Sequence, residues 1–558
     1  MIFFFYIKII IISIIQNIAN FFFSFLIIYD ERYLNILKIK NRVKYSKSPY
    51  LQKQISGKVK KKVIFEMFNI NENILAFYFW SIVFRFKNHD CFVYPLKINL
   101  PFYNPKSFLI YKKLGFKLID WKISYQQELE IKKELKKINL NKINKKEFLN
   151  LKIKQIIVGD LIYDHYLRYN SEPTLKLDSK EIKSLLYKAI KILIFWDDYF
   201  KSNNVSNFCF SHSPYLLGIP NRVAIKHNID SMCITGNSVY RFNKKIFYLG
   251  DQFRNAKKLL NNFYKRIGSK NALKIKKKYR KDFIDIVTGK NKNIIGTLAF
   301  NQKNTFKKIK KKNKLIIKNK FKILIAGHDF YEGPNVWGKF LFPDFYEWIL
   351  FLSNYINKDK KNKRVWYIKP HPDASLDQIK IIRNIIKDNK KIKILSSNVT
   401  HRQLIDMKIN FILTARGSMG YQYAYFGINT LLCSDISLYN NFNYLVKSKS
   451  IHDYISKLNN LETLSKRKIN LEGVINFYLV LNIYIWCQDN DFIFPNINLY
   501  LKKRKIIFNQ ARTEKYTVDT FPFIIKHLTN KQIEKIFLII DNFLNDKKKL
   551  IPETKFIK

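Results

Sequence analysis

The sequence predicts an α/β protein whose two halves each contain a parallel, Rossmann-like sheet. In both halves, short β-branched and apolar runs alternate with helix-like segments, which is the pattern of parallel sheets. The chain has 558 residues, 47% of them hydrophobic and 16% aromatic, enough for two or three domains with their own cores. A Lys-rich stretch at 257–320 separates the two alternating regions. We therefore expect two α/β domains joined by a connector.

The formal net charge of +59 does not by itself indicate a nucleic-acid partner. Lys is spread along almost the whole chain and no recognised nucleic-acid motif accompanies it, so we expect no nucleic-acid binding. A basic surface still attracts anionic lipids, at about 1 kcal/mol for each nearby Lys or Arg. The five Cys residues form no close pair and no zinc spacing, which indicates a reduced, cytosolic main body.

Residues 1–29 are hydrophobic and carry one charge, at Lys8. The run from 9 to 28 is long enough to cross a bilayer. Its polar residues repeat at helical spacing: Ser13, Gln16, Asn17, Asn20 and Ser24. That stripe suits a helix lying in the membrane interface or a spanning helix with a partner, and a buried core helix is the third interpretation. The basic linker at 30–62 favours the cytoplasmic side of the inner membrane. We expect a membrane-associated N-terminal helix.

The N-terminal α/β domain is expected at 63–256. Strands are predicted at 63–70 and 91–96, with a helix between them, and a further strand at 206–211. Residues 122–154 are polar, Lys-rich and helical in pattern, which indicates a solvated excursion from the sheet.

The C-terminal α/β domain is expected at 321–490 and a helical extension at 491–558. Its predicted strands are FKILIA, RVWYIKP, KIKIL, NFILTA and TLLCS. Helices are predicted near 343–354 and at 530–546. Ligands of parallel sheets bind outside the carboxyl ends of the strands, so the predicted site lies in a cleft where those ends of the two sheets face each other.

The motif YIKPHPDAS, at 367–375, places a histidine at the tip of a predicted strand. Pro370 and Pro372 restrict the backbone on both sides of His371 and make the turn rigid. A preset imidazole beside Lys369 suits the stabilisation of a leaving-group phosphate. The alternative is a histidine that packs between two turn prolines.

The segment TARGSMG follows another predicted strand and precedes a predicted helix. Glycine lets the backbone approach an anion closely, and the start of a helix offers unpaired N–H groups to it. Arg416 adds a charge and Ser418 a hydroxyl to the turn at Gly417. The sequence therefore predicts a phosphate contact at these three residues.

A second histidine, His328, directly follows the first predicted strand of the C-terminal domain. The following FPDFYEW segment predicts a helix capped by Asp344 with an aromatic face toward the core. His328 has no such packing explanation, so we expect it to face the cleft and to take part in catalysis.

Several motifs together resemble the capsule and surface-polysaccharide biosynthesis proteins. They are GDLIYDHYLR, FSHSPYLLGIPNRVAIKHN, AGHDFYEGP, LFPDFYEW, IKPHPD and TARGSMGYQYAYFGI. That family is GT-B glycosyltransferase-like and similar to polysialyl-, Kdo- and glycerophosphotransferases. The resemblance covers 155–240 and 321–435. It implies a GT-B-like fold, with two Rossmann-like domains facing a cleft, and a transferase that needs neither metal nor cofactor.

The resemblance also implies that the C-terminal half holds a nucleotide-activated donor. His371 and the turn at Gly417 and Ser418 would contact the nucleotide and its phosphate. Such families often have Glu in the next helix to bind a ribose, where this chain has Gln422. A charge-assisted hydrogen bond to the ribose is thereby lost.

An acceptor hydroxyl needs a general base in the N-terminal half. Asp164 in GDLIYDHYLR and His212 in SHSPY are the candidates, although carboxylates near turns also cap helices. No DxD-like pair in a suitable loop indicates a metal-bound diphosphate. We expect a glycosyltransferase of surface or capsular polysaccharide synthesis, acting on a glycan or lipid-linked acceptor at the membrane surface. Transfer of a polyol phosphate is the alternative, and Gln422 motivates a third hypothesis, a non-catalytic scaffold.

Overall fold

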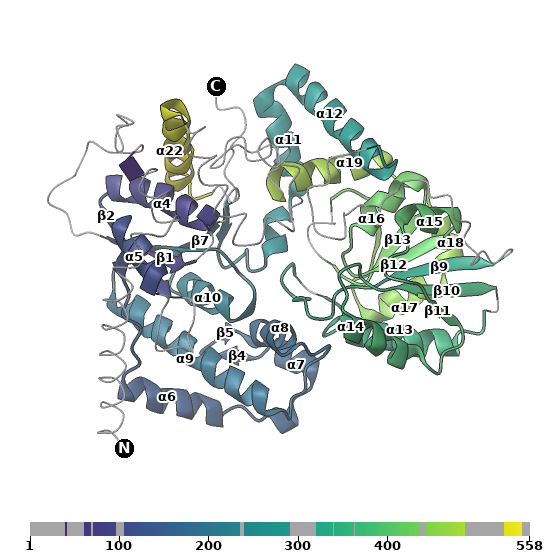
Figure 1. The fold of residues 1–558 in the computed structure, drawn as a ribbon, viewed down its shortest axis with the longest axis horizontal. Helices are drawn as coiled ribbons and strands as arrows, with labels where there is room; N and C mark the ends of the chain where they lie inside the picture. Colours follow the sequence, from purple (N-terminus) through teal and green to yellow (C-terminus); the bar gives the residue numbers. More distant parts are fainter. Residues whose placement is uncertain are drawn as a thin grey trace.

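The computed structural model contains two six-stranded sheets, one in each half of the chain (Figure 1). It describes residues 40–41, 61–68, 71–95, 105–234, 239–290, 320–338, 340–361, 363–435, 441–485 and 529–548. The predicted hydrophobic segment at 1–29 lies outside these residues. Within them, no helix has both the length and the apolar character needed to cross a membrane.

The N-terminal sheet has the strand order β3-β2-β1-β6-β7-β8. Its strands are β1 (Lys61–Met67), β2 (His89–Pro95), β3 (Lys117–Leu118), β6 (Val205–Phe210), β7 (Asp230–Ile234) and β8 (Val239–Phe242). All neighbours are parallel except β7 and β8, which pair antiparallel. The order reverses between β1 and β6, as in doubly wound sheets. The main helices of this half are α4 (Asn71–Phe86), α5 (Pro105–Lys113), α9 (Lys180–Ser202) and α10 (Ile219–Lys226).

The C-terminal sheet repeats this topology with the order β11-β10-β9-β12-β13-β14, all parallel. Its strands are β9 (Phe321–Ala326), β10 (Arg364–Lys369), β11 (Ile392–Ile394), β12 (Phe411–Thr414), β13 (Asn429–Leu432) and β14 (Val446–Lys447). The helices around it are α13 (Phe345–Lys358), α14 (Leu376–Ile386), α15 (His401–Asp406), α17 (Ile451–Asn459) and α18 (Leu461–Ser465). The mixed α/β fold with parallel sheets that the sequence predicts is confirmed.

The apolar composition of the strands explains their place in the molecule. The last five residues of β1 and all six of β10 are buried, because helices cover both faces of each sheet. Asp344 begins α13 by accepting a hydrogen bond from the Glu347 amide, as the sequence predicts. In the chain, α11 (Ala256–Ile267) and α12 (Ser269–Val287) come between the two sheets, and α12 packs on α19 (Leu471–Val480) at the top of the view (Figure 1).

The segment predicted as a solvated excursion is part of the N-terminal domain. It contains α6 (Tyr125–Lys136), α7 (Lys145–Leu149) and the first strand of a short hairpin, β4 (Lys152–Ile153) with β5 (Ile156–Ile157). Its helical character is confirmed, but α6 packs along α9 and buries Ile131, so this part of the prediction is wrong. The hairpin leads into α8 (Gly159–Asn170).

Candidate functional site

The carboxyl ends of three adjacent strands, β10, β9 and β12, carry the predicted residues of the C-terminal domain. His371 follows β10, His328 follows β9, and the Arg416–Gly417 turn follows β12. The strand order reverses between β9 and β12, which is where doubly wound sheets bind ligands. His328 and the turn at Arg416 are thus brought together at this switch point, with His371 on the neighbouring strand.

The imidazole of His328 is buried and is held from several sides. Its ring stacks on Phe345, with the ring centroids 4.6 Å apart and the planes 18° apart. Its Nε2 accepts a hydrogen bond from the Arg416 amide at 3.3 Å and lies 3.3 Å from Oγ1 of Thr414. Burial lowers the pKa of His328 well below its usual range, and the charge of Arg416 acts in the same direction. The ring is therefore neutral, and because Nε2 accepts, its proton is on Nδ1.

The conformation of His371 is set within its own turn. Nδ1 accepts a hydrogen bond from the Asp373 amide at 3.2 Å, and the Asp373 carboxylate lies 3.8 Å from the same nitrogen. In the neutral imidazole the proton is then on Nε2, on the other side of the ring. The side chain remains partly exposed. The two histidines thus present one N–H donor each.

Lys369, the last residue of β10, is 3% exposed. Its Nζ donates to the carbonyl of Ser397 at 3.0 Å. Burial lowers the pKa of Lys369 to about 8. No carboxylate in the described residues pairs with this ammonium group, so an anion near it would be stabilised.

The turn after β12 requires glycine at Gly417. A Cβ atom there would lie 2.9 Å from Oγ1 of Thr414, the atom to which the Gly417 amide donates, and 3.8 Å from Nε2 of His328. The helix predicted after the turn is short: α16 (Met419–Gln422) gives way to a 3₁₀ turn, η7 (Tyr423–Phe426). Ser418 precedes α16, and its hydroxyl makes no capping hydrogen bond.

Gln422 lies in α16 and is 3% exposed. Within the described residues its Oε1 accepts no hydrogen bond. A buried acceptor left unpaired costs about 1–3 kcal/mol, so a hydroxyl donated to Oε1 would be favourable. Neutral glutamine supplies this acceptor without the charge that the resemblance leads one to expect.

Asp164 lies on α8 and joins the two domains. It is 1% exposed, and its carboxylate accepts hydrogen bonds from the amide and the side chain of Asn335, at 3.2 and 2.9 Å. Burial raises the pKa of Asp164 to about 8. Gly333 of the same loop lies against this carboxylate, and its carbonyl accepts from the Arg416 guanidinium at 2.9 Å. Asp164 thus orients the loop that follows β9.

Two further contacts fix α13 to the N-terminal domain. The hydroxyl of Tyr163 donates to Asp344 at 2.5 Å, and Lys145 pairs with Glu347 at 2.5 Å. The domains therefore touch where the sequence predicts a cleft, through α8 on one side and the β9–α13 loop on the other.

His212 occupies the switch point of the N-terminal sheet. It follows β6 by two residues, as His328 follows β9. Its Nδ1 lies 2.7 Å from Oγ of Ser211, and its ring packs on Phe68 with the centroids 4.8 Å apart. Ser211 in turn contacts Glu66, a buried carboxyl in β1. From here the chain enters η3 (Tyr215–Gly218), which packs on α8.

Sequence reasoning missed Thr414, Asn335, Glu66 and Ser211. Thr414 and Ser211 stand beside residues that the motifs did single out, so strand-tip position could have identified them. Glu66 is an acidic residue inside an apolar strand, which is a visible signal of a buried carboxyl with a role. Asn335 has no such signal, because its partner lies 171 positions away.

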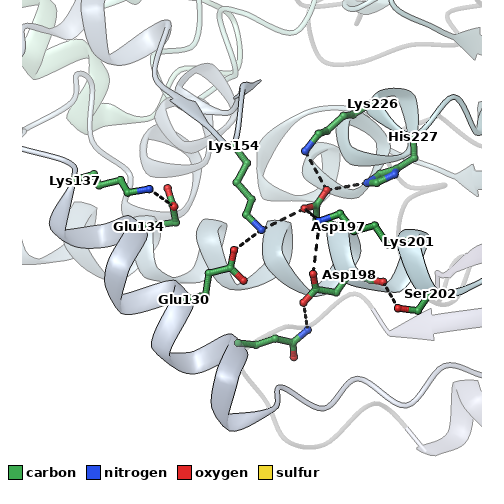
Figure 2. Close-up of polar contacts among 11 residues, drawn as sticks. Glu130, Glu134, Lys137, Lys154, Asp197, Asp198, Lys201, Ser202, Lys226 and His227 are labelled. Carbon is green, nitrogen blue, oxygen red and sulfur yellow. Dashed lines mark hydrogen bonds and ion pairs between the residues drawn. The ribbon is translucent and has the colours of Figure 1, made fainter.

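Outside the candidate site, the N-terminal domain contains a dense cluster of charged side chains around Asp197 (Figure 2). The buried carboxylate of Asp197 contacts four cationic or titratable side chains, Lys154, Lys201, Lys226 and His227. Burial alone would raise the pKa of Asp197, but the hydrogen bonds from Lys201, His227 and Lys226 hold it well below its usual range. The cluster joins the ends of α9 and α10 just before β6 and β7 begin. It therefore lies at the amino-terminal edge of the sheet, opposite the carboxyl ends of the strands, and links α9 to α10.

No protein-family model and no curated protein matches the sequence. Solved structures similar to this chain include a UDP-GlcNAc 2-epimerase from Neisseria meningitidis bound to UDP-GlcNAc (10% identity, TM-score 0.24, 76% of this chain and 98% of that one). The S. aureus MnaA–UDP co-structure has 10% identity and a TM-score of 0.24, over 77% of this chain and 97% of that one. Acinetobacter baumannii MurG has 9% identity and a TM-score of 0.23, over 77% and 100%. Values this low do not establish a common overall arrangement, a substrate or an activity, so the fold of this chain is defined by the strand order of its own two sheets.

Proposed function

We propose that this chain is a GT-B-like glycosyltransferase of bacterial surface or capsular polysaccharide synthesis. It would transfer a sugar from a nucleotide-activated donor to a hydroxyl of a glycan or lipid-linked acceptor. One observation carries the proposal: each of two doubly wound sheets has a histidine two residues beyond a strand at its switch point, and the loops from both edges meet at α8. Two ligand edges joined in this way suit a reaction between two substrates.

The donor half of the reaction would use the C-terminal domain. As the bond between the anomeric carbon and the phosphate oxygen breaks, that oxygen keeps the electron pair and gains negative charge. Nδ1–H of His328 and Nε2–H of His371 are fixed donors for such charge, and the ammonium group of Lys369 adds a buried positive field. Preorganised donors of this kind stabilise the transition state without reorganising when charge develops.

The acceptor half would use the N-terminal domain. An acceptor hydroxyl gives its proton to a base as its oxygen bonds to the anomeric carbon. His212 would be this base, a role supported by its position two residues beyond β6 at the N-terminal switch point. Asp164 is engaged in binding the β9–α13 loop, so we assign it to the positioning of that loop.

Nucleotide binding separates this function from the non-catalytic scaffold. The unpaired Oε1 of Gln422 supports a ligand hydroxyl in the C-terminal domain, such as one from a ribose. We expect calorimetry and thermal shift with CMP, CDP, UDP and GDP to show saturable binding of at least one nucleotide. His371→Ala should weaken or abolish catalysis, whereas His452→Ala, at an exposed histidine on α17, should not. A chain that binds none of the four nucleotides would contradict the proposal.

The chemical products separate glycosyl transfer from polyol-phosphate transfer. In glycosyl transfer the acceptor gains a sugar and no phosphorus, whereas polyol-phosphate transfer moves phosphorus onto the acceptor. Mass spectrometry of the acceptor after incubation with each donor class distinguishes them. We further propose that the reaction takes place at the cytoplasmic side of the inner membrane, a location supported by the hydrophobic segment 1–29 and the basic linker after it.

A further inference from the structure

A buried acidic residue stands behind His212 in the N-terminal domain. Glu66 lies in β1, next to β6 in the sheet, and is 0% exposed. Its Oε2 accepts a hydrogen bond from the Ser211 amide at 2.5 Å and is also contacted by the Ser211 hydroxyl. The same hydroxyl oxygen is 2.7 Å from Nδ1 of His212. Glu66, Ser211 and His212 therefore form one chain of contacts at the switch point.

The direction of the hydrogen bonds in this chain follows from the donors available. Oε2 of Glu66 already accepts from the Ser211 amide, so it is an acceptor for the Ser211 hydroxyl as well. A hydroxyl has one proton to donate, so its oxygen can only accept from His212. Nδ1 of His212 then carries the proton, and Nε2 presents a lone pair. That is the tautomer a general base requires.

Glu66 is the acidic side chain of this chain of contacts, and the titratable groups around it are neutral near pH 7. The titratable groups whose charge bears on it are Tyr94 on β2, Tyr111 on α5 and Cys233 on β7. Burial raises the pKa of all three, so they are neutral near pH 7. Burial also raises the pKa of Glu66 to about 7 and lowers the pKa of His212. The other neighbour of His212 is the uncharged ring of Phe68.

Ser211 is not placed as a nucleophile. It is 3% exposed, and both its amide and its hydroxyl are directed to Glu66. Its position between a carboxyl and an imidazole instead suits a hydroxyl that orients the imidazole by hydrogen bonds to both groups.

We propose that Glu66 and Ser211 are positioning residues that hold His212 as the base for the acceptor hydroxyl. This inference rests on the proposed function and adds the two residues that orient its base. In the step, the acceptor O–H proton moves to Nε2 of His212 and the acceptor oxygen bonds to the anomeric carbon, while the nucleotide phosphate leaves with the electron pair of the broken bond. The imidazolium then donates Nδ1–H to Ser211, whose hydroxyl donates to the Glu66 carboxylate. The proton stays on histidine, so no further co-reactant is needed.

Three substitutions in the full-length chain test this arrangement. Ser211→Ala removes the bridge but keeps the backbone amide that binds Glu66, and Ser211→Thr restores a hydroxyl. Glu66→Gln keeps an acceptor oxygen for Ser211 and removes the charge. Ser206→Ala, at the amino end of the same strand and with a hydroxyl that contacts the carbonyl of Lys62, is the matched control.

The first measurement is carbethoxylation of His212 by diethyl pyrocarbonate, followed peptide by peptide by mass spectrometry between pH 5 and 9. It reports the titration of His212 without any transfer activity. Because the pKa of Glu66 is raised to about 7 and the pKa of His212 is lowered, the two groups titrate as a coupled pair within this pH range. We expect the wild type, Ser211→Thr and Ser206→Ala to show the coupling as a profile that departs from a one-proton curve, and Glu66→Gln and Ser211→Ala to approach a one-proton curve. A profile that stays like wild type in both Glu66→Gln and Ser211→Ala would overturn the inference.

The second measurement is sugar transfer at saturating donor. Ser211→Ala should lower kcat by about tenfold to a hundredfold with little change in KM for the acceptor, because general bases contribute typically 10²–10⁴-fold. Ser211→Thr should recover most of the loss. If the titration profile changes but kcat does not, His212 is not the base and the inference fails. If the wild-type chain transfers no sugar although His212 titrates as expected, the coupling stands and the proposed function is what fails.

Discussion

His371 offers a direct test at the level of a single side chain. Its N–H donor is oriented by Asp373, so His371→Ala should remove transition-state stabilisation while leaving donor binding largely intact. We expect turnover to fall about a hundredfold or more, the usual cost of losing one preorganised donor. The melting temperature, measured beside single-turnover sugar transfer, should stay near that of the wild type.

Packing between Pro370 and Pro372 predicts the opposite result for the same variant. The melting temperature would then fall, and the folded fraction would keep most of its activity. The exposed His452→Ala controls for the loss of any imidazole. Native melting together with unchanged turnover would remove His371 from the mechanism.

The positions of single site residues could be predicted from the sequence where the residue directly follows a predicted strand. His328, His371 and the Arg416–Gly417 turn each follow an apolar strand, and adjacent parallel strands end at one edge. The relation of Glu66 to Ser211 could not be predicted in this way, since it depends on β1 pairing with β6 across 145 positions. The tautomers of the histidines could not be predicted either, because they follow from hydrogen bonds that the spacing of residues in the sequence does not show.

Among the elements, strands were predicted more reliably than the ends and partners of helices. β9 coincides with its predicted range, because a six-residue apolar strand buried on both faces has a simple pattern. The helix predicted after the Gly417 turn is four residues long and gives way to a 3₁₀ turn, which the sequence pattern does not indicate. The pattern at 530–546 correctly predicts a helix, α22 (Asn530–Asn545), but does not indicate what the helix packs against.

The partner of α22 is α4, at the other end of the sequence (Figure 1). Phe543 packs edge-on against Trp80, and the guanidinium of Arg241 lies 4.2 Å from the centre of its ring. Arg241 also donates to the carbonyls of Phe543 and Asp546, where a cation stabilises the end of a helix. A C-terminal helix thus completes the core of the N-terminal domain.

Phe543→Ala should therefore destabilise the N-terminal domain by about 3–5 kcal/mol, the usual cost of emptying a buried phenylalanine site. Leu538→Ala on the exposed side of the same helix is the matched control, with an expected change within about 0.5 kcal/mol. Hydrogen exchange followed by mass spectrometry should show faster exchange in α4 peptides and no change in α13 peptides. Equal effects of the two substitutions would show that α22 does not pack as described.

Across the whole molecule, contacts between the domains were the least predictable feature. The sequence predicts two parallel sheets, and two six-stranded sheets are present, one of them with an antiparallel edge strand. It does not predict that the β9–α13 loop rests on α8 through Asp164 and Asn335, because neither residue carries a signal for the other. The sequence offers Asp164 as a candidate base, and its hydrogen bonds to Asn335 at the domain contact support our proposal that it positions the loop instead.

We predict that the whole chain associates with a membrane, through electrostatic attraction, hydrophobic insertion or both. The net charge of +59 attracts anionic lipids, whereas segment 1–29 offers hydrophobic insertion. Salt separates them, since the Debye length falls from about 10 Å at 0.1 M to about 3 Å at 1 M. We expect the full-length chain to sediment with anionic vesicles at both salt concentrations, and the chain lacking 1–29 to be released at 1 M salt with its melting temperature unchanged. Release of the full-length chain at 1 M salt would assign the anchoring to the basic surface alone, and a truncated chain that stays bound at 1 M salt would place a hydrophobic anchor outside 1–29.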